Sequence, residues 1–562
     1  MSEKEPNPQT ASRREFLTRT GGSLAALSAL AAACTESPPP ATGTAQPGAA
    51  PAAAVPVPKP RSKTAPQAPF DSLRDYVAAL EARGLLLRIP RIDQDEYETT
   101  ALLFRAIDRY GMFGAPALLF ENIKVDGQWM EGPVLANHQG NWDTDCILAG
   151  IEPVPDDRFA TYRKAKAHWT KLLDAGGGSY PLIPPVEIVR EQAPCKEVVL
   201  TGDEIDLLKF PFIKTNPSDA GRYLNTGSVF TTDEKLGDNF GTYRCEITGP
   251  RKLSINSEKN HVGYKTWMAA RERGEQTAKV SIVVGQDPIV WLLSGAPIAR
   301  RRDEKVDELA MAGGMRGKAL EVVRSETNSL LIPAHCEMVV EGEIPLQDPL
   351  VTEGPFGEMF GYLGPQKEAV FTMNVTKVTH RKKPWILNSY TGMHRGYTTS
   401  PVEALYDQLL RKMVPGLVEF HYPQNMMGVA FASIDKTSPH EGLDAGRQIA
   451  ARIPIVKVMV VVDREMNILD PVEMWFTVGS RWQPFPASEI IPEARGIITD
   501  PSAPVDWVSS NIVIDATKQW PEEGGPEVFP GRNRTLLEEG APKSFVRVDA
   551  QFGDLLKDWG RG

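Results

Sequence analysis

Cysteines and basic clusters are both scarce in this sequence, and their scarcity excludes several kinds of site. The five cysteines are spaced by about fifty residues or more and form no CxxC pair, which argues against zinc ribbons and dithiol redox centres. The net charge is −10, and no basic run is interleaved with aromatic residues, so nucleic acid is not an expected partner. We find no internal repeat, and no run beyond residue 34 is apolar enough over its length to suggest a membrane span.

The first 34 residues resemble an export signal. The twin-arginine pattern Ser12-Arg13-Arg14-Glu15-Phe16-Leu17 precedes an Ala-rich stretch over 23–33, about half the ~20 residues that span a bilayer. We therefore expect export through the twin-arginine machinery to the periplasm. The residues before Cys34 also loosely resemble a lipoprotein cleavage box, which would attach a lipid anchor to Cys34. Because this route carries folded proteins out of a reducing cytosol, we expect buried free thiols and a cofactor acquired before export.

Composition and periodicity divide the rest of the chain into a linker and three domains. Residues 35–69 are rich in Pro, Ala and Thr and nearly lack large apolar side chains, which predicts a disordered linker. The order of apolar patterns then predicts an α/β domain over 70–190, a β-barrel-like domain over 191–375 and an α/β domain over 376–562. The elements expected are helices over 73–83, 101–110 and 401–413 and strands over 85–89, 115–120, 227–232, 242–248, 279–284, 290–294 and 455–462.

Two carboxylates five residues apart stand out in the segment Glu353-Gly-Pro-Phe-Gly-Glu358, which is followed by Gly361. Glycine and proline at this density predict an irregular turn rather than a helix. In such a turn the backbone can approach a ligand closely and the fold can hold both acids. One acid can then orient a charged partner while the other keeps or delivers a proton. A solvated surface turn is the alternative that these residues alone leave open.

Several distinctive short segments follow one another along most of the folded chain. The most specific are Pro333 to Gly342, which contains Glu337 and Glu341, and Glu353 to Glu358. The others are Asp71-Ser-Leu-Arg-Asp-Tyr76, Ala117-Leu-Leu-Phe-Glu-Asn122, Asp238-Asn-Phe-Gly-Thr-Tyr-Arg244, Asp307-Glu-Leu-Ala-Met-Ala-Gly313 and Ile514-Asp-Ala-Thr-Lys518. Together they resemble the UbiD family of prenylated-FMN-dependent decarboxylases. The resemblance implies that the central domain is a split β-barrel-like flavin-binding domain and that the protein forms a homo-oligomer, a dimer or hexamer.

By this resemblance, the metal ligands are Asn239, His261 and Glu308. An amide oxygen, an imidazole and a carboxylate suit Mn²⁺ or Mg²⁺ better than Zn²⁺, and the ion would join the protein to the cofactor phosphate. Potassium is a further ion that the resemblance allows. Taken singly, the three residues could instead be a capping Asn, a surface His and a solvated Glu. The other cofactor contacts implied are Thr226, Thr242, Tyr243, Arg244, Ser294 and Pro297, although residues 294–297 could also form a simple turn that ends a strand.

The resemblance also implies a catalytic trio of Arg244, Glu353 and Glu358. Arg244 has the planar, permanently charged group that can hold a substrate carboxylate or pair with Glu353. Glu358 would return a proton to the carbon that loses CO₂, and prenylated FMN would be the electron sink. The expected activity is non-oxidative decarboxylation of an aromatic or α,β-unsaturated carboxylic acid. The alternative for the trio is a buried Arg–Glu pair that only joins two strands.

Two other functions stay open at this point. The chain could be an exported flavin- or metal-binding carrier or sensor without decarboxylase activity. It could also be a metal-assisted hydrolase that uses the same metal ligands with Glu358 as its base. Tyr390, Met393, His394 and Tyr397 lie in a Gly-containing loop that could line the substrate pocket or could be a plain surface loop.

Overall fold

The computed structural model describes residues 65–296, 298–299, 306–393, 395–396, 399–503 and 507–558. The predicted export signal, Cys34 and most of the predicted linker lie outside these residues. Pro297, His394 and Tyr397 lie outside them too. Within the described residues, no helix is both long and apolar enough to cross a membrane.

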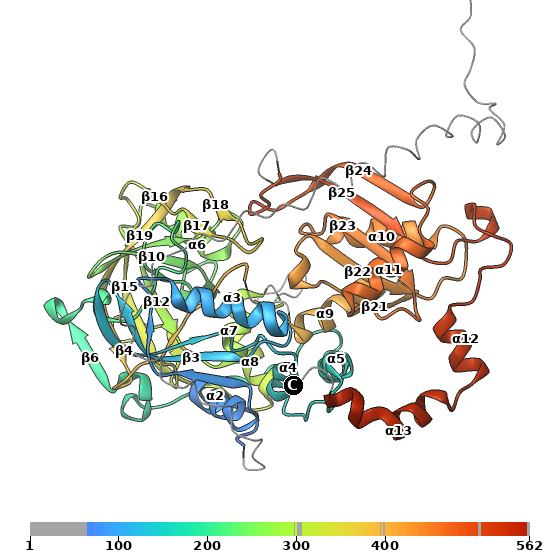
Figure 1. Cartoon of the computed structure of the whole chain (residues 1–562). Coiled ribbons are helices and arrows are strands. Elements are labelled where there is room, and N and C mark those ends of the chain that lie inside the picture. The colour runs from blue at the N-terminus through green and yellow to red at the C-terminus, as the bar shows by residue number, and fades with distance from the viewer. Residues whose placement is uncertain are drawn as a thin grey trace, which may run out of the picture. The chain divides into compact units, whose positions relative to one another are not determined.

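The N-terminal region is an α/β unit (Figure 1). A strand from far along the chain completes its sheet. Its strands are β1 (Leu86–Ile89), β2 (Ile92–Asp93), β3 (Ala117–Val125), β4 (Gln128–Ala136) and β20 (Ile386–Leu387), and its helices are α2 (Leu73–Ala82), α3 (Glu98–Tyr110), α4 (Asp143–Leu148) and α5 (Arg158–Ala175). Ser72 caps α2 through a reciprocal capping box with Asp75, as its position in the sequence predicts. Strand β20 pairs in parallel with β4, although some 250 residues separate the two (136 to 386).

The central region is built on a ten-stranded sheet in which every pairing is antiparallel. Its eight-strand path runs β7 (Tyr223–Leu224), β10 (Arg244–Gly249), β11 (Lys252–Asn256), β19 (Lys367–His380), β15 (Met338–Pro345), β12 (Thr277–Val284), β8 (Ser228–Thr231) and β9 (Asn239–Thr242). The strands β6 (Val198–Thr201) and β16 (Val351–Glu353) add to β19. The smaller sheets are β14 (Leu331–Pro333), β13 (Glu321–Arg324) and β5 (Val186–Glu187), and the hairpin β17 (Phe356–Gly357) and β18 (Leu363–Gly364). The sheet curls into a half-barrel, which agrees with the expected fold class.

The strand predicted over 290–294 is wrong, because these residues belong to the helix α7 (Pro288–Gly295). Asp287 caps this helix by accepting the amides of Ile289 and Val290, and Pro288 occupies the first helical position. The helix is buried on all sides, so its sequence has no polar face and looks like a buried strand. Ser294 and Gly295 therefore belong to this helix, and Ala296 is its C-cap residue. The other helices of this region are α6 (Val262–Glu272) and α8 (Glu308–Arg316).

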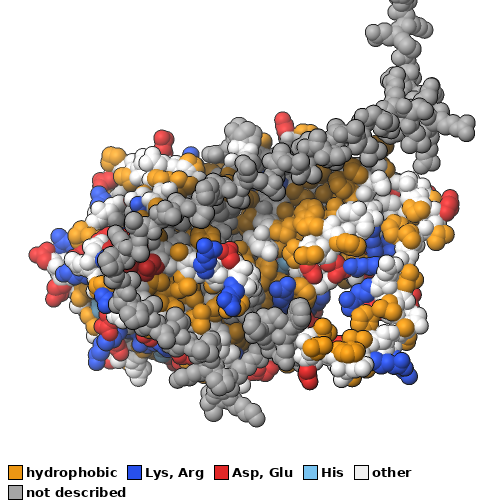
Figure 2. Space-filling view, viewed as in Figure 1, with side chains coloured by type: hydrophobic (Ala, Val, Ile, Leu, Met, Phe, Trp, Pro, Cys, Tyr) orange, Lys and Arg blue, Asp and Glu red, His pale blue; other side chains and the backbone are white. Residues whose placement is uncertain are grey.

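The C-terminal region has its own five-stranded sheet, coloured orange to red in Figure 1. The strand order is β21 (Leu417–His421), β22 (Val429–Ile434), β23 (Val458–Asp463), β25 (Val508–Asp515) and β24 (Ser488–Arg495). Its three middle strands are parallel, and both edge strands are antiparallel. The helices are α9 (Ser400–Arg411), α10 (Glu441–Arg452), α11 (Pro471–Arg481), α12 (Asn533–Gly540) and α13 (Ser544–Asp558). Figure 2 shows hydrophobic side chains gathered over parts of this region. The exposed large hydrophobic residues of the region include Phe485 and Leu555.

The hydrophobic cores show how the regions are joined. Two large cores each contain side chains from both the N-terminal and the central region. Two smaller cores lie within the C-terminal region. The predicted domain boundary at 375/376 falls inside β19, and the chain returns to the N-terminal sheet at β20 before it enters the C-terminal region. The four described cysteines are buried free thiols, as expected for these positions: Cys146, Cys195, Cys245 and Cys336.

Candidate functional site

Arg244 joins the two acids of the turn. It lies at the start of β10 and forms two parallel hydrogen bonds to Glu353, from Nε to Oε1 at 2.9 Å and from Nη2 to Oε2 at 2.8 Å. Its Nη1 donates to Oε1 of Glu358. Burial opposes the charge of Arg244, but the hydrogen bonds that Arg244 donates to Glu353 and the charges of both carboxylates outweigh it and raise the pKa of the guanidinium. The three side chains thus form one charged cluster, with Glu353 1% exposed and the Glu358 side chain 14% exposed.

The glycines of the turn bring these acids close to their neighbours. Gly354 adopts a φ of +86°, which only glycine adopts readily, between Glu353 and the hairpin of β17 and β18. A Cβ on Gly364 would lie 2.5 Å from Cγ of Glu358, so this position must be glycine for Glu358 to occupy its place. A Cβ on Gly392 would likewise lie 2.5 Å from the carbonyl oxygen of Glu358. The loop after β20 therefore packs directly on the backbone of the turn that carries Glu353 and Glu358.

Backbone hydrogen bonds fix the same turn from the other side. The amide of Gly357 donates to Oδ1 of Asp219 at 2.9 Å, and the amide of Ala220 donates to the carbonyl of Pro355 at 2.8 Å. The amide of Glu358 donates to the carbonyl of Tyr362 at 2.8 Å. The turn is thus held by the fold, which excludes a freely solvated surface turn.

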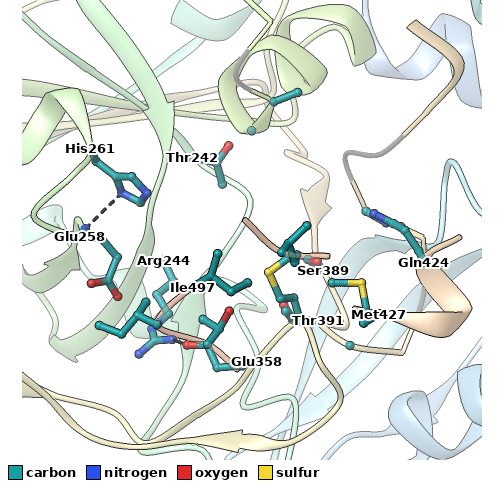
Figure 3. A pocket seen from close by; sticks show the side chains of 18 of the residues that line it. Thr242, Arg244, Glu258, His261, Glu358, Ser389, Thr391, Gln424, Met427 and Ile497 are labelled. Atoms are coloured by element: carbon teal, nitrogen blue, oxygen red, sulfur yellow. Dashed lines mark hydrogen bonds and ion pairs between the residues drawn. The ribbon is translucent and has the colours of Figure 1, made fainter. Parts of the chain in front are cut away.

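A cavity of about 580 Å³ opens at this cluster, within the range of about 300–1,000 Å³ that is common for small-molecule sites. Figure 3 shows Arg244 and Glu358 directed toward each other at one side of it and Gln424 and Met427 at another. The central region contributes polar lining groups, namely Asn225, Thr242, Tyr243, Arg244, Asn256, Glu258, Asn260, His261 and Glu358. The C-terminal region contributes mainly apolar ones, namely Val402, Tyr406, Phe420, Tyr422, Met427, Ile453, Ile455, Ile497, Ile498 and Trp507.

Some of the predicted cofactor contacts line this cavity and others do not. Thr242, Tyr243 and Arg244 are lining residues, and Oγ1 of Thr242 lies 2.6 Å from Oγ of Ser294. Ser294 does not itself line the cavity, but Gly295 and Ala296 beside it do. Thr226 also lies outside the lining, because its hydroxyl donates to the carbonyl of Leu387 in β20 at 2.6 Å.

The three predicted metal ligands surround the ring of Tyr243. His261 stacks on this ring with centroids 5.2 Å apart. Asn239 lies within hydrogen-bonding reach of the Tyr243 hydroxyl, and the charge of Glu308 acts on the same hydroxyl. Asn239 and Glu308 lie close together, since the amide of Phe240 lies 3.4 Å from Oε2 of Glu308. Among the described residues, the buried Nδ2 of Asn239 makes no hydrogen bond of good geometry, although the Tyr243 hydroxyl is near, so the amide can turn its oxygen toward a cation. Asn239 and Glu308 therefore fit a hard divalent ion.

His261 fits less simply. Its Nδ1 accepts a hydrogen bond from the amide of Glu258 at 3.1 Å, drawn as the dashed line in Figure 3. A neutral imidazole that accepts at Nδ1 carries its proton on Nε2, so neither nitrogen is then available to a metal. Ligation by His261 would require the ring to give up the Glu258 bond. Among the described residues, no three His, Cys, Asp or Glu side chains gather as a metal cluster.

Sequence reasoning missed two parts of the cavity. Ser389, Thr391 and Gly392 line it, whereas the neighbouring Tyr390 and Met393 point into the core. The alternation of buried and lining residues in this loop has no local sequence signal. The apolar wall of the C-terminal region was also missed, because its residues come from five separate segments that only the fold brings together.

Comparison with known proteins agrees with this geometry. The model of the 3-octaprenyl-4-hydroxybenzoate carboxy-lyase Rift-related domain (UbiD) matches residues 187–394, and that of the corresponding C-terminal domain (UbiD_C) matches residues 397–516. An uncharacterized protein of Aeropyrum pernix is 30% identical over 507 residues, which cover 87% of this chain and 100% of that protein.

Solved structures give the same result. The UbiD-class enzyme HmfF from Pelotomaculum thermopropionicum, in complex with FMN, is 28% identical with a TM-score of 0.68, and the match covers 82% of this chain and 96% of that one. An evolved dimeric form of HmfF in complex with prFMN is 26% identical with a TM-score of 0.66, covering 84% and 98%. From the two family matches, which together span more than half of the sequence, and from the fold, we conclude that this chain belongs to the UbiD family.

Proposed function

We propose that the protein is a non-oxidative decarboxylase that uses prenylated FMN to remove CO₂ from an aromatic or α,β-unsaturated carboxylic acid. One observation carries this proposal: Arg244 is bonded to both Glu353 and Glu358 at the edge of a cavity large enough for a small molecule. The FMN and prFMN bound to HmfF support the choice of cofactor. When bound, prenylated FMN supplies the electron sink for the carbanion character that develops as CO₂ leaves.

The residues of the cluster divide the remaining work. Arg244 can turn N–H groups that hold the two acids in the resting state toward a substrate carboxylate in the cavity. Until substrate binds, Glu353 keeps the guanidinium in position by accepting two hydrogen bonds. Glu358 is the proton donor: the bond from carbon to CO₂ breaks, and a new C–H bond forms with the proton from its carboxyl group. Its 14% exposed side chain can then recover a proton from solvent.

The lining of the cavity supports a substrate with one carboxylate and an apolar body. Arg244 is the only Lys or Arg among the described lining residues, so a second carboxylate would find no permanent cation there. The opposite wall is formed by aliphatic, aromatic and thioether side chains such as Met427, Ile455 and Trp507. Such a wall stabilises a ring or alkyl group in proportion to the apolar area removed from water.

A divalent ion, Mn²⁺ or Mg²⁺, is proposed at Asn239 and Glu308, with His261 as the third ligand once its ring leaves the Glu258 amide. The ion would neutralise the cofactor phosphate next to the carboxylate of Glu308. Export through the twin-arginine route, with or without lipid on Cys34, is proposed from the N-terminal sequence. Fractionation of cells that make the full-length chain would test it, and recovery only in the cytosol would contradict it.

The decisive experiment is turnover by protein purified from cells that make the cofactor. We expect the flavin absorption spectrum together with CO₂ release from at least one member of a panel of cinnamic, benzoic and naphthoic acids. A protein that shows the spectrum but releases no CO₂ across the panel would instead support a flavin-binding carrier or sensor. Activity in the presence of metal and absence of flavin would support the hydrolase.

A further inference from the structure

Tyr223 lies beside the catalytic cluster, on the same face of the sheet as Arg244. It is in β7, directly opposite Glu246 of β10 in an antiparallel pair, so the side chains of the two share one face. Arg244 is two residues before Glu246 and projects to that face as well. The ring of Tyr223 lies 4.6 Å from that of Phe356, and the guanidinium of Arg244 lies 4.7 Å from the same Phe356 ring.

The hydroxyl of Tyr223 is buried and has no hydrogen-bond partner of good geometry among the described residues. The residue is 1% exposed. Burial raises the pKa of the phenol, and the nearby charges of Glu353 and Glu246 raise it further. The hydroxyl is thus within reach of Glu353 and of Glu246, but its geometry to either acid falls short of a well-formed hydrogen bond. Burying a hydroxyl without a well-formed hydrogen bond lowers the stability of the folded protein, so the presence of Tyr223 here needs an explanation.

Arg244 explains why a spare donor is needed here. Its guanidinium binds Glu353 in the resting state and, under the proposed function, also has to bind the substrate carboxylate. Both oxygens of Glu353 accept from it, at 2.9 and 2.8 Å, and Glu353 is 1% exposed. When the guanidinium turns toward a substrate carboxylate, an oxygen of Glu353 loses its donor in a place that water does not reach. A buried carboxylate without donors is strongly disfavoured.

The other groups around Glu353 do not offer that donor. Lys367 is its partner across β16 and β19, but the ammonium of Lys367 binds Glu258 at 3.2 Å. Glu246 and Glu358 are acids, and the thiol of Cys245 is a weak donor on the opposite face of β10.

We propose that Tyr223 is a positioning residue whose hydroxyl binds Glu353 when Arg244 turns to the substrate carboxylate. The hydroxyl then replaces the lost guanidinium N–H, and Glu353 stays charged and in place through the reaction. Proton transfer remains with Glu358, because Glu353 has no need to take up a proton. This inference rests on the proposed function for its kinetic consequences, but its binding consequence can be measured without turnover.

The test is a double-mutant cycle of Tyr223→Phe and Glu353→Gln in flavin-loaded protein, read by calorimetric titration with benzoate. We expect Tyr223→Phe to weaken benzoate binding about tenfold in the native background and to have little effect in the Glu353→Gln background, where no charge needs a donor. In turnover, Tyr223→Phe should raise KM more than it lowers kcat. The acid limb of its pH–rate profile should move up by about one pH unit.

Tyr180→Phe is the matched control, because it also removes the hydroxyl of a buried tyrosine. The Tyr180 hydroxyl donates to the carbonyl of Pro401 at 2.6 Å and does not line the cavity. We expect this variant to unfold at a lower temperature with an unchanged pH profile. Tyr223→Phe should keep or raise the unfolding temperature, because the lost hydroxyl has no well-formed bond in the resting state.

Equal benzoate affinity in Tyr223→Phe and the parent protein would overturn the inference, and so would equal losses in both backgrounds of the cycle. If the parent protein binds benzoate but releases no CO₂ from any acid, the proposed function fails while the cycle still decides the role of Tyr223.

Discussion

The central half-barrel and the C-terminal region contribute to the same cavity with opposite chemistry. The central region provides Arg244, Glu358 and the polar groups around Tyr243, and Glu353 binds Arg244 from outside the lining. Neighbouring backbone holds the turn that carries both acids. The C-terminal region provides a wall of apolar side chains and has its own hydrophobic cores. The comparison teaches that the charged and the apolar parts of the cavity come from different regions of the chain. Under the proposed function, reactivity and substrate choice should therefore each be alterable without the other.

The largest effect is expected in the central region, from Glu358→Gln. The amide has nearly the same shape but cannot deliver a proton, so kcat should fall by about 10²–10⁴-fold. The flavin spectrum should stay unchanged. The exposed Glu368, ten residues further on, gives a control in Glu368→Gln, which should keep full activity. Normal turnover by Glu358→Gln would show that Glu358 is not the proton donor. It would also contradict the proposal that the central region carries out the proton transfer.

Arg244→Lys tests the geometry of the cluster separately from its charge. Lysine keeps the positive charge but cannot make two parallel bonds to Glu353 while it also reaches Glu358. We expect kcat/KM to fall about 100-fold, consistent with the loss of one or two charge-assisted hydrogen bonds. Steady-state kinetics on an active acid would measure it. An activity within a few-fold of the parent protein would mean that charge alone is sufficient.

Metal content distinguishes the proposed ligands from one another. Glu308→Gln should weaken metal binding about 10–100-fold, because it removes the only carboxylate of the set. His261→Asn should have a smaller effect, since Nδ1 of His261 already accepts from the Glu258 amide. Both variants can be compared by elemental analysis after dialysis against a weak chelator. A larger loss from His261→Asn would show that giving up the Glu258 bond costs His261 little as a metal ligand.

The C-terminal wall is tested by Met427→Ala. Loss of a large apolar contact should lower kcat/KM for the bulkiest active acid by about tenfold and leave the smallest acid nearly unaffected. Ile490→Ala in β24 is a control within the same region, because Ile490 is 70% exposed and lies outside the cavity lining. A uniform loss for all acids would contradict the division between reactivity and substrate choice.

The smallest effect is expected from Glu441→Gln at the start of α10, and it concerns only the free energy of unfolding. Glu441 accepts the amide of Thr437 at 2.5 Å and the hydroxyl of Ser438 at 2.8 Å, and the pKa of its carboxyl is lowered from 4.5 to about 2, mainly by the Thr437 amide. Since the folded value is the lower one, the carboxylate stabilises the fold above pH 4.5, and this contribution is lost as the pH falls through about 2. Glu441→Gln should cost about 1 kcal/mol or less at pH 6, because the group is largely solvated. The unfolding temperatures of the variant and the parent protein should converge as the pH falls toward 2, and turnover at neutral pH should be unchanged. A difference in unfolding temperature that stays constant with pH would contradict the titration.

The parts of the molecule that sequence could predict are those decided by local chemistry. Ser72 and the apolar spacing after it mark α2, and the β-branched run over 279–284 marks β12. The Gly/Pro turn with its two acids was recognisable because the constraint lies within ten residues. The helix α7 was taken for a strand because a helix buried on all sides shows no period that distinguishes it.

Long-range pairing set the limit of prediction for the site. The opposition of Tyr223 and Glu246 depends on strand register, and the hydrogen bond at Nδ1 of His261 depends on how a loop closes. The apolar wall draws on segments from Val402 to Trp507 that no spacing rule connects. Resemblance to the family could suggest Arg244, Glu353 and Glu358 as a group. It could not show which nitrogens of Arg244 donate to which carboxylate.

The return of the chain to β20 has a consequence for biosynthesis. Strand β4 is complete at residue 136, but the edge that Ile386 and Leu387 cover stays open until some 250 further residues have left the ribosome (136 to 386). At about 5–20 residues per second, this interval is on the order of 10–50 s. During that time a nascent chain exposes an unpaired strand edge, which is where a chaperone would be needed and where truncated products would aggregate. The N-terminal and central regions must therefore mature as one unit, late in translation.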